Sequence, residues 1–392
     1  MSNLDQTKIT QSGGALPAGR QRFLGSYLGS YLAAESNSFG VVRIAMALAV
    51  LVSHSYLLAR GTSVAEPLHS LTGHSLGEHA VQVFFFLSGI LVAQSFDRSR
   101  SLLDFVSGRF LRIFPGLIVC VLLTALALGP LVSMLEPSRY FTDPQVLGYI
   151  ARTLSLSTGS APLPGVFEAH PLPAIVNMSL WTLKYEVLCY AGLAFAGACG
   201  LFKPAWRTVT AALLAGLLAL IFIEQPKAIE TYTSIDNIRY FALFFGMGTL
   251  AYLVRDWLPI HGAVVVPLFA LFAFALGTRF GELATALFLG YATLWVATLS
   301  FGPLRQFTNR YDLSFGAYIY ACPIQQLLIE KLPGIDPLLA AALAMIVVLP
   351  LAFLSWVLVE RPALNQRSRL SAAVSGIVPR SLPFQAAKKI FA

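Results

Sequence analysis

Two side chains that could take part in chemistry, Arg43 and His54, lie in one long apolar segment near the start of the sequence. Their spacing corresponds to about three turns of an α-helix, so both would project from one face, about 16 Å apart along the axis. Neutral imidazole accepts a proton from a hydroxyl near pH 7, so His54 is a candidate general base, and Arg43 is a candidate for binding an anionic donor. Two simpler interpretations stay open: Arg43 extends to the inner headgroups, and His54 is a hydrogen-bonded packing residue.

A carboxylate that could assist this base occurs in the segment 179–186, which ends at Glu186. We expect Glu186 in the outer half of a membrane span at the depth of His54, where it could orient the imidazole or stabilise its protonated form. A local pairing with Lys184 is the alternative, although residues two apart do not share a helix face. Trp181, in the same segment, could equally belong to the interfacial belt of aromatic residues.

Arg109 and Arg112 form a basic pair, and a helix would bring these two residues together at the cytoplasmic face. Guanidinium groups bind phosphates well, including those of a nucleotide-bearing acyl carrier. Anchoring on anionic lipid explains such a pair at least as readily. The pair Ser88-Gly89 also has a simple structural explanation, which is a tight contact between two helices.

A histidine-rich loop contains His69, His74, Glu78 and His79. Imidazole and carboxylate groups are suitable zinc ligands, which makes this loop a candidate metal site. Glu78 and His79 are adjacent, however, and therefore diverge on any helix, and the loop has no HxxxH-type spacing. We predict no metal site.

These residues belong to a chain of strongly apolar composition. Of its 392 residues, 12% are charged and 56% are hydrophobic, and the mean hydropathy is +0.70. An ordinary soluble domain has about a quarter charged residues. The composition excludes a soluble enzyme, a disordered chain, a disulfide scaffold and a nucleic-acid-binding domain. The cysteines lie in apolar stretches and are interpreted as small buried hydrophobic residues: Cys120, Cys189, Cys199 and Cys322.

Apolar runs that approach the roughly 20 residues needed to cross a bilayer recur along the chain. The sequence therefore predicts an all-α, polytopic integral membrane protein with about ten transmembrane helices. Pro115 and Pro130 would fall near the ends of the third span, where a missing N–H matters least. The predicted spans are 39–59, 80–96, 113–135, 179–199, 206–223, 238–254, 262–278, 283–301, 311–329 and 337–359.

The distribution of basic residues predicts the orientation of these spans. With both termini in the cytoplasm, 18 of the 27 Lys and Arg residues lie in cytoplasmic segments and 7 in outer segments, as the positive-inside rule requires. The domain division that follows is a cytoplasmic N-terminal segment, 1–38, a transmembrane domain, 39–362, and a cytoplasmic C-terminal tail, 363–392. The long loop from about residue 136 to residue 178 would be external and could partly cover an outward-facing site.

Six short motifs, in order along the transmembrane domain, resemble those of the integral-membrane acyltransferase family 3, which O-acylates cell-surface glycans and related acceptors. The first motif is the pair Arg43 and His54, and the last is Glu360-Arg361-Pro362. Each motif alone is weak, but six in the same order are specific. The other four motifs occupy residues 80–89, 109–115, 179–186 and 313–320.

The resemblance implies roles for individual residues. Arg43 and His54 would be essential, with Glu186 beside them, Arg109 and Arg112 would bind the donor, and Lys184 and Tyr318 join Ser88 and Trp181 in lining the site. The chain departs from many family members in two places: Gln82 stands where they have an acidic residue, and residues 320–323 lack the histidine of the late tyrosine motif. We therefore assign no carboxylate role to Gln82 and expect no second catalytic histidine.

The resemblance also implies an activity and a location. We expect an O-acyltransferase of the bacterial inner membrane, most simply an O-acetyltransferase, that uses cytoplasmic acyl-CoA as donor substrate and needs no cofactor. Its acceptor would be a hydroxyl of a surface polysaccharide or related glycan. Only about 30 residues follow Pro362, too few for the extracytoplasmic hydrolase-like domain of some relatives. The chain would act alone or with a partner in polysaccharide biosynthesis. The alternatives are a transporter or flippase of lipid-linked glycan, in which Arg43 and His54 bind phosphate or relay protons, and an inactive sensor or scaffold.

Overall fold

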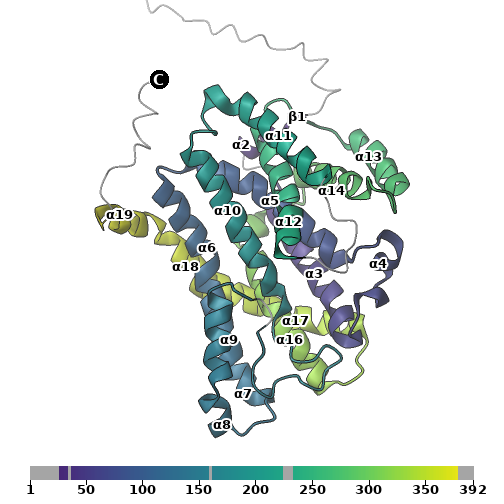
Figure 1. The fold of residues 1–392 in the computed structure, drawn as a ribbon, viewed down its shortest axis with the longest axis vertical. Helices are drawn as coiled ribbons and strands as arrows, with labels where there is room; N and C mark the ends of the chain where they lie inside the picture. The colour runs from purple at the N-terminus through teal and green to yellow at the C-terminus, as the bar shows by residue number, and fades with distance from the viewer. Residues whose placement is uncertain (1–25, 34–36, 159–160, 224–232, 378–392) are drawn as a thin grey trace, which may run out of the picture.

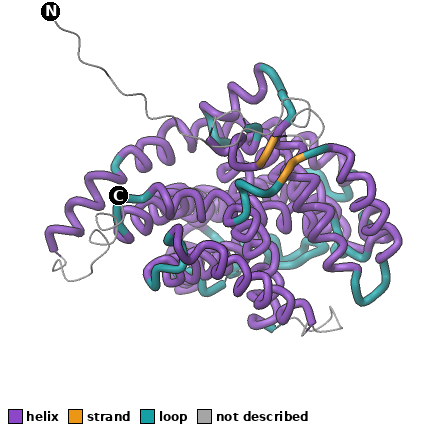
Figure 2. Tube along the Cα trace, turned by 90° about the horizontal axis from the view of Figure 1, so that it is seen from above, coloured by secondary structure: helices purple, strands orange, loops and turns teal. Residues whose placement is uncertain are grey.

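The structure is a computed structural model that describes residues 26–33, 37–158, 161–223 and 233–377. Within these residues, strands β1 (Ser26–Tyr27) and β2 (Pro259–Ile260) form one short antiparallel pair, in which Ser26 lies opposite Ile260. Helices make up the rest of the regular structure, which confirms the predicted all-α class (Figures 1 and 2). Residues 1–25 of the predicted N-terminal segment and residues 378–392 of the predicted tail lie outside the described residues.

Five helices that contact one another form the centre of the molecule. The start of α5 (Leu76–Arg98) is fixed by a capping box in which the Ser75 side chain and Glu78 exchange hydrogen bonds with each other's backbone N–H. Helices α5 and α12 (Ser234–Leu253) approach so closely that a Cβ atom at Gly89 or Gly248 would overlap the facing backbone, which confirms a tight helix contact at Ser88-Gly89. The five helices are α3 (Phe39–Arg60), α5 (Leu76–Arg98), α12 (Ser234–Leu253), α16 (Ser314–Lys331) and α17 (Pro337–Ser355).

Further helices surround this centre (Figure 1). At one side, α14 (Gly281–Thr298) packs against α13 (Gly262–Ala275). At another, the C-terminal helix α19 (Arg367–Ile377) packs on the start of α6 (Leu102–Leu123), where Arg367 bonds to Asp104 through Nε and NH2. Other helices around the centre are α2 (Leu28–Ala33), α4 (Pro67–Thr72), α10 (Leu183–Ala198), α11 (Arg207–Ile223), α15 (Pro303–Arg310) and α18 (Arg361–Asn365), with short helical turns η1 (Ser63–Ala65), η3 (Met178–Thr182) and η4 (Pro204–Trp206).

The long loop predicted between the third and fourth spans contains helices α8 (Pro137–Thr142) and α9 (Pro144–Leu154). The segment that follows packs its apolar side chains inward, since Val166, Phe167 and Val176 are buried. His170 attaches the same segment to α16, because its ring nitrogens lie 2.8 Å from Gln326 Oε1 and 2.7 Å from Glu330 Oε2. The loop is thus a folded cover on one end of the bundle.

Helices long and apolar enough to cross a membrane are present among the described residues, which agrees with a membrane protein, but the predicted count of about ten is not confirmed. Five segments meet that test by length and composition, or six if α14 and α15, which are bent by 105°, count as one broken span. The other predicted spans are shorter or more polar: α10 has 16 residues, and α16 buries Gln325 and Gln326. The five segments are Phe39–Arg60, Leu76–Arg98, Leu102–Val132, Pro204–Ile223 and Pro337–Ala373.

Two local predictions need correction. Helix α6 begins at Leu102 because the Ser101 side chain caps it, so Pro115 lies inside the helix and not near its end. After α6, the chain continues through a π-helical turn, η2 (Thr124–Leu128), into α7 (Gly129–Val132). Cys199 is exposed because it follows the last residue of α10, whereas the other three cysteines are buried and all four are free.

Candidate functional site

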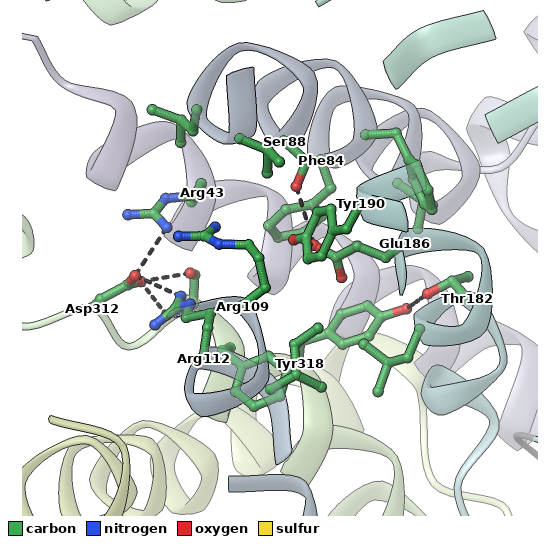
Figure 3. A pocket seen from close by; sticks show the side chains of 18 of the residues that line it. Arg43, Phe84, Ser88, Arg109, Arg112, Thr182, Glu186, Tyr190, Asp312 and Tyr318 are labelled. Atoms are coloured by element: carbon green, nitrogen blue, oxygen red, sulfur yellow. Dashed lines mark hydrogen bonds and ion pairs between the residues drawn. The ribbon is translucent and has the colours of Figure 1, made fainter. Parts of the chain in front are cut away.

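A cavity of about 320 Å³ lies between six of the helices described above, the turn η3, and η6 (Trp356–Glu360), a π-helical turn after α17 (Figure 3). Basic, acidic and aromatic side chains share its wall, which is unusual inside an apolar bundle because isolated charges are costly there. Its polar and aromatic lining residues are Arg43, Phe84, Phe85, Ser88, Arg109, Arg112, Thr182, Glu186, Tyr190, Asp312, Ser314, Phe315, Tyr318 and Trp356.

The basic part of the wall is built around Asp312, which lies in the short link before α16. Arg43 NH1 lies 2.9 Å from Asp312 Oδ2, and Arg112 NH2 lies 2.6 Å from the same oxygen. The other carboxylate oxygen, Oδ1, accepts a hydrogen bond of 2.7 Å from Ser314 Oγ. One carboxylate therefore joins α3, α6 and α16.

A second carboxylate and two rings enclose Arg112. Glu360 Oε2 lies 3.7 Å from Arg112 NH1, and only 1% of the Glu360 side chain is exposed. The guanidinium carbon lies 5.7 Å from the ring centre of Phe315 and 5.9 Å from that of Trp356, within the range of cation–π interactions. This makes Arg112 the most heavily contacted cation of the cavity wall.

The opposite part of the wall is centred on Glu186. Ser88 Oγ donates a hydrogen bond of 3.1 Å to Glu186 Oε1, and the Tyr190 hydroxyl donates to the same oxygen. Arg109 lies above the Tyr190 ring at 5.8 Å and donates from NH2 to Ser95 Oγ at 3.3 Å. The Glu186 carboxylate is thus held by two hydroxyl groups.

His54 is not among the residues that line this cavity, but a chain of contacts connects it to the wall. The Nδ1 atom of His54 lies 3.4 Å from Ser179 Oγ. The carbonyl of Ser179 accepts a hydrogen bond of 2.7 Å from the hydroxyl of Tyr318, which also lies 2.7 Å from Thr182 Oγ1. The expected contact between Glu186 and His54 does not occur among the hydrogen bonds of the described residues, because Glu186 faces Ser88 and Tyr190.

Six of the predicted site residues meet at the cavity, and the others do not. Trp181 is 38% exposed and packs against Tyr185 and Phe241, with ring centres 5.7 and 5.5 Å apart. The ammonium of Lys184 lies 4.7 Å from the ring centre of Tyr185. Neither residue lines the cavity. The six that do are Arg43, Ser88, Arg109, Arg112, Glu186 and Tyr318.

Sequence reasoning missed four polar residues of this region. Asp312 directly precedes the motif 313–320, and Glu360 opens the last motif, so both were close to recognised patterns. Ser179 begins the motif 179–186, and Tyr190 lies one helical turn after Glu186. The spacing from Glu186 to Tyr190 was a usable signal, since residues four apart share a helix face. The contacts of Asp312 with arginines on other helices had no such local signal.

The histidine-rich loop forms ion pairs, and no group of three His, Cys, Asp or Glu side chains suited to a metal ion occurs in the described part of the chain. His74 Nε2 lies 2.5 Å from Glu282 Oε1, and Nδ1 lies 3.6 Å from Glu78 Oε2. Burial alone would lower the pKa of His74, but the hydrogen bonds and negative charges of Glu282 and Glu78 raise that pKa to about 10.

This raised pKa predicts how the stability depends on pH. Because the pKa of His74 is higher in the folded protein than in an unfolded chain, its ion pairs stabilise the fold fully below about pH 6.5, and the contribution is lost as the pH rises through about 10. The difference in Tm between the wild type and His74→Gln, measured in detergent, should be largest near pH 6 and shrink toward pH 10. A difference that grows with pH would contradict the pairing.

Comparison with known proteins gives two kinds of match. A family model described as an acyltransferase domain matches residues 36–357. The chain is 33% identical over 347 residues to the "O-acetyl transferase" of Shigella phage Sf6, a match that covers 85% of this chain and 98% of that protein. It is 26% identical over 374 residues to "Nodulation protein 10" of Rhizobium leguminosarum bv. viciae, covering 86% and 95%. No solved structure matches significantly.

Proposed function

The chain belongs to acyltransferase family 3, and from this premise we propose that it transfers an acetyl group from cytoplasmic acetyl-CoA to a hydroxyl of a surface polysaccharide or related glycan. The family makes it a membrane acyltransferase. The choice of acetyl is supported by the relative from Shigella phage Sf6, whose name is O-acetyl transferase. The observation that carries the proposal is the cavity in which three arginines and Glu186 share one wall.

The arginines of the cavity support the proposal that the donor is anionic and carries phosphate groups. Arg43, Arg109 and Arg112 come from two helices and meet in one cavity, and guanidinium groups are the preferred partners of phosphate. His54 lies about 16 Å from Arg43 along α3. A donor with its phosphates at the arginines would need a long flexible arm to bring its thioester to His54, and acyl-CoA has such an arm.

In the proposed reaction, His54 acts as general base for direct transfer. The acceptor oxygen forms a bond to the thioester carbonyl carbon while its proton passes to His54 Nε2. The carbon–sulfur bond then breaks, the acyl group stays on the acceptor oxygen, and the CoA thiolate takes the proton from the imidazolium. For this step, His54 must keep its own proton on Nδ1, where it can donate to Ser179 Oγ. No cofactor takes part.

Ser179 is therefore expected to affect the rate through the tautomer of His54. Ser179→Ala removes the partner of Nδ1 but keeps the backbone carbonyl that receives the Tyr318 hydroxyl. We expect kcat to fall by about tenfold, because one hydrogen bond of about 1 kcal/mol or more orients the base, with KM for the donor unchanged. Steady-state kinetics in detergent measure both values. A change confined to KM would contradict this role.

The proposed orientation in the membrane follows from the distribution of Lys and Arg residues between the two predicted sides. We propose that the protein lies in a bacterial inner membrane with both termini in the cytoplasm, so that the Arg43 end of α3 faces the acyl-CoA pool. Cysteine labelling of Arg100→Cys and Arg152→Cys, two exposed positions at opposite predicted sides, tests the orientation. A membrane-impermeant thiol reagent should label intact cells only at position 152.

Mass spectrometry of surface glycans tests the acceptor. Glycans from a deletion strain complemented with the wild-type gene should carry the mass increment of an acetyl group, and those from the strain complemented with His54→Ala should not. An unchanged glycan mass with a smaller amount of surface glycan would instead favour a transporter of lipid-linked glycan. An unchanged mass and amount would exclude surface glycan as the acceptor.

A further inference from the structure

The three arginines of the cavity do not have equivalent surroundings. We infer that Arg109 is the cation that binds the anionic part of the donor, whereas Asp312 is a positioning residue that holds Arg43 and Arg112 in place. The inference rests on the proposed acyl-CoA donor. It assigns different roles to Arg109 and Arg112, which the sequence alone did not distinguish.

The Asp312 carboxylate is held rigidly between two arginines and the start of α16. Its Oδ2 atom receives both Arg43 and Arg112, at 2.9 and 2.6 Å. Its Oδ1 atom accepts hydrogen bonds from the Ser314 side chain at 2.7 Å and from the Ser314 backbone N–H at 3.4 Å. Both oxygens are therefore occupied, and the first turn of α16 fixes the carboxylate. Figure 3 shows Asp312 at one side of the cavity with both arginines directed toward it.

Arg112 is the arginine least able to receive a new anion. Asp312 and Glu360 already flank its guanidinium, and the rings of Phe315 and Trp356 lie within cation–π range of it. Glu360 Oε2 has no hydrogen-bond partner among the described residues, so the charge of Arg112 is its nearest compensation. A phosphate that took Arg112 would leave a buried carboxylate without its cation, which is unfavourable.

Arg109 has the opposite surroundings. Among the residues that the structure describes, no carboxylate lies within ion-pair distance of its guanidinium. Its contacts are the neutral Ser95 hydroxyl at 3.3 Å and the ring of Tyr190 at 5.8 Å. Figure 3 shows its guanidinium in the middle of the cavity, between Arg43 and the side chains of Tyr190 and Glu186. A phosphate can therefore bind Arg109 without displacing a carboxylate.

Coenzyme A itself is the probe that separates these tasks, because it carries the phosphates of the donor but no acyl group. Binding to purified protein in detergent is measured by isothermal titration calorimetry, after thermal unfolding has shown that each variant is folded. Arg109→Gln should weaken binding by about tenfold to a hundredfold, the usual loss for charge-assisted hydrogen bonds to phosphate. Arg112→Lys keeps a cation between Asp312 and Glu360 and should bind within about threefold of the wild type. Arg100→Gln, an exposed arginine at the same predicted side, is the matched control.

Asp312→Asn provides a second test, in which coenzyme A binding and kcat are measured on the same variant. A merely structural role would not change kcat while leaving binding intact. Removal of a negative charge should not weaken the binding of an anion, so coenzyme A should bind within about threefold of the wild type or more tightly. The transfer rate kcat should fall by at least about tenfold, because Arg43 and Arg112 lose their common anchor. Weaker coenzyme A binding with unchanged kcat would overturn the positioning role.

Two outcomes would overturn the division of tasks. Arg109→Gln with wild-type affinity would show that another group binds the phosphates, and an Arg112→Lys variant that is folded but loses binding would assign them to Arg112. A wild-type protein that transfers acyl groups yet does not bind coenzyme A would instead overturn the proposed donor, and with it this inference. The wild-type titration distinguishes that failure from the first two.

Discussion

Replacement of His54 by alanine is expected to lower acyl transfer by about 10²–10⁴-fold while the protein still folds, because positioned general bases contribute rate factors of this size. Only one polar contact of the His54 ring occurs among the described residues, the 3.4 Å approach of Ser179 Oγ to Nδ1. Loss of that long contact should change the stability little. Turnover is measured with purified protein, acetyl-CoA and a glycan acceptor, beside thermal unfolding of the same samples.

A matched histidine variant makes this result specific. His69→Ala removes an imidazole from α4, a helix that contributes no residue to the cavity, and should keep wild-type turnover. His54→Ala should leave the affinity for coenzyme A unchanged, because His54 does not line the cavity that holds the arginines and lies about 16 Å from Arg43 along α3. Near-full transfer by His54→Ala would mean that another group removes the proton, and Glu186 would then be the next residue to replace.

Replacement of Arg112 by glutamine is expected to cause the largest loss of stability, about 3 kcal/mol in the free energy of unfolding. The reason is that two carboxylates lose their common cation. Asp312 and Glu360 have side chains that are 13% and 1% exposed, so water compensates them poorly. Removal of one partner from such a group costs more than the ion pair itself contributes. The Tm of the detergent-solubilised variant measures the loss.

Two further variants test that the loss comes from uncompensated charge. Glu360→Gln in the Arg112→Gln background should restore part of the Tm, because it removes the carboxylate that is left without a cation, whereas Asp312 still pairs with Arg43. Asp256→Asn breaks the pair of Arg207 with Asp256, whose side chain is 55% exposed, and should cost less than about 1 kcal/mol. Equal losses for Arg112→Gln and Asp256→Asn would contradict the explanation.

The sequence predicted well those features that lie within one helix. Apolar runs located the helices around Arg43 and Glu186, and the first motif placed Arg43 and His54 together on α3. The basic motif placed Arg109 and Arg112 on α6, and both line the cavity. These predictions succeeded because spacing along a helix decides which residues share a face.

Predictions that needed the arrangement of several helices were less successful. Glu186 was expected to orient the imidazole of His54, but the structure turns Glu186 toward Ser88 and Tyr190. Trp181 and Lys184 belong to the same motif as Glu186, yet both lie outside the cavity wall. The depth of a residue along a span and its membership of a motif do not determine which neighbour its side chain faces, because that depends on how each helix is rotated in the bundle.

By itself, the sequence determined that this protein is a helical membrane protein of acyltransferase family 3, because run length, composition and motif order are properties of the chain alone. Only the tertiary structure decided which charges compensate each other. Arg112 and Asp312 are 200 residues apart, and they meet because α6 and α16 pack together at one cavity. Contacts across such distances depend on the positions and rotations of whole helices, which local spacing does not contain. The proposed role of Asp312, and the distinction between Arg109 and Arg112, therefore came from the fold and not from a motif.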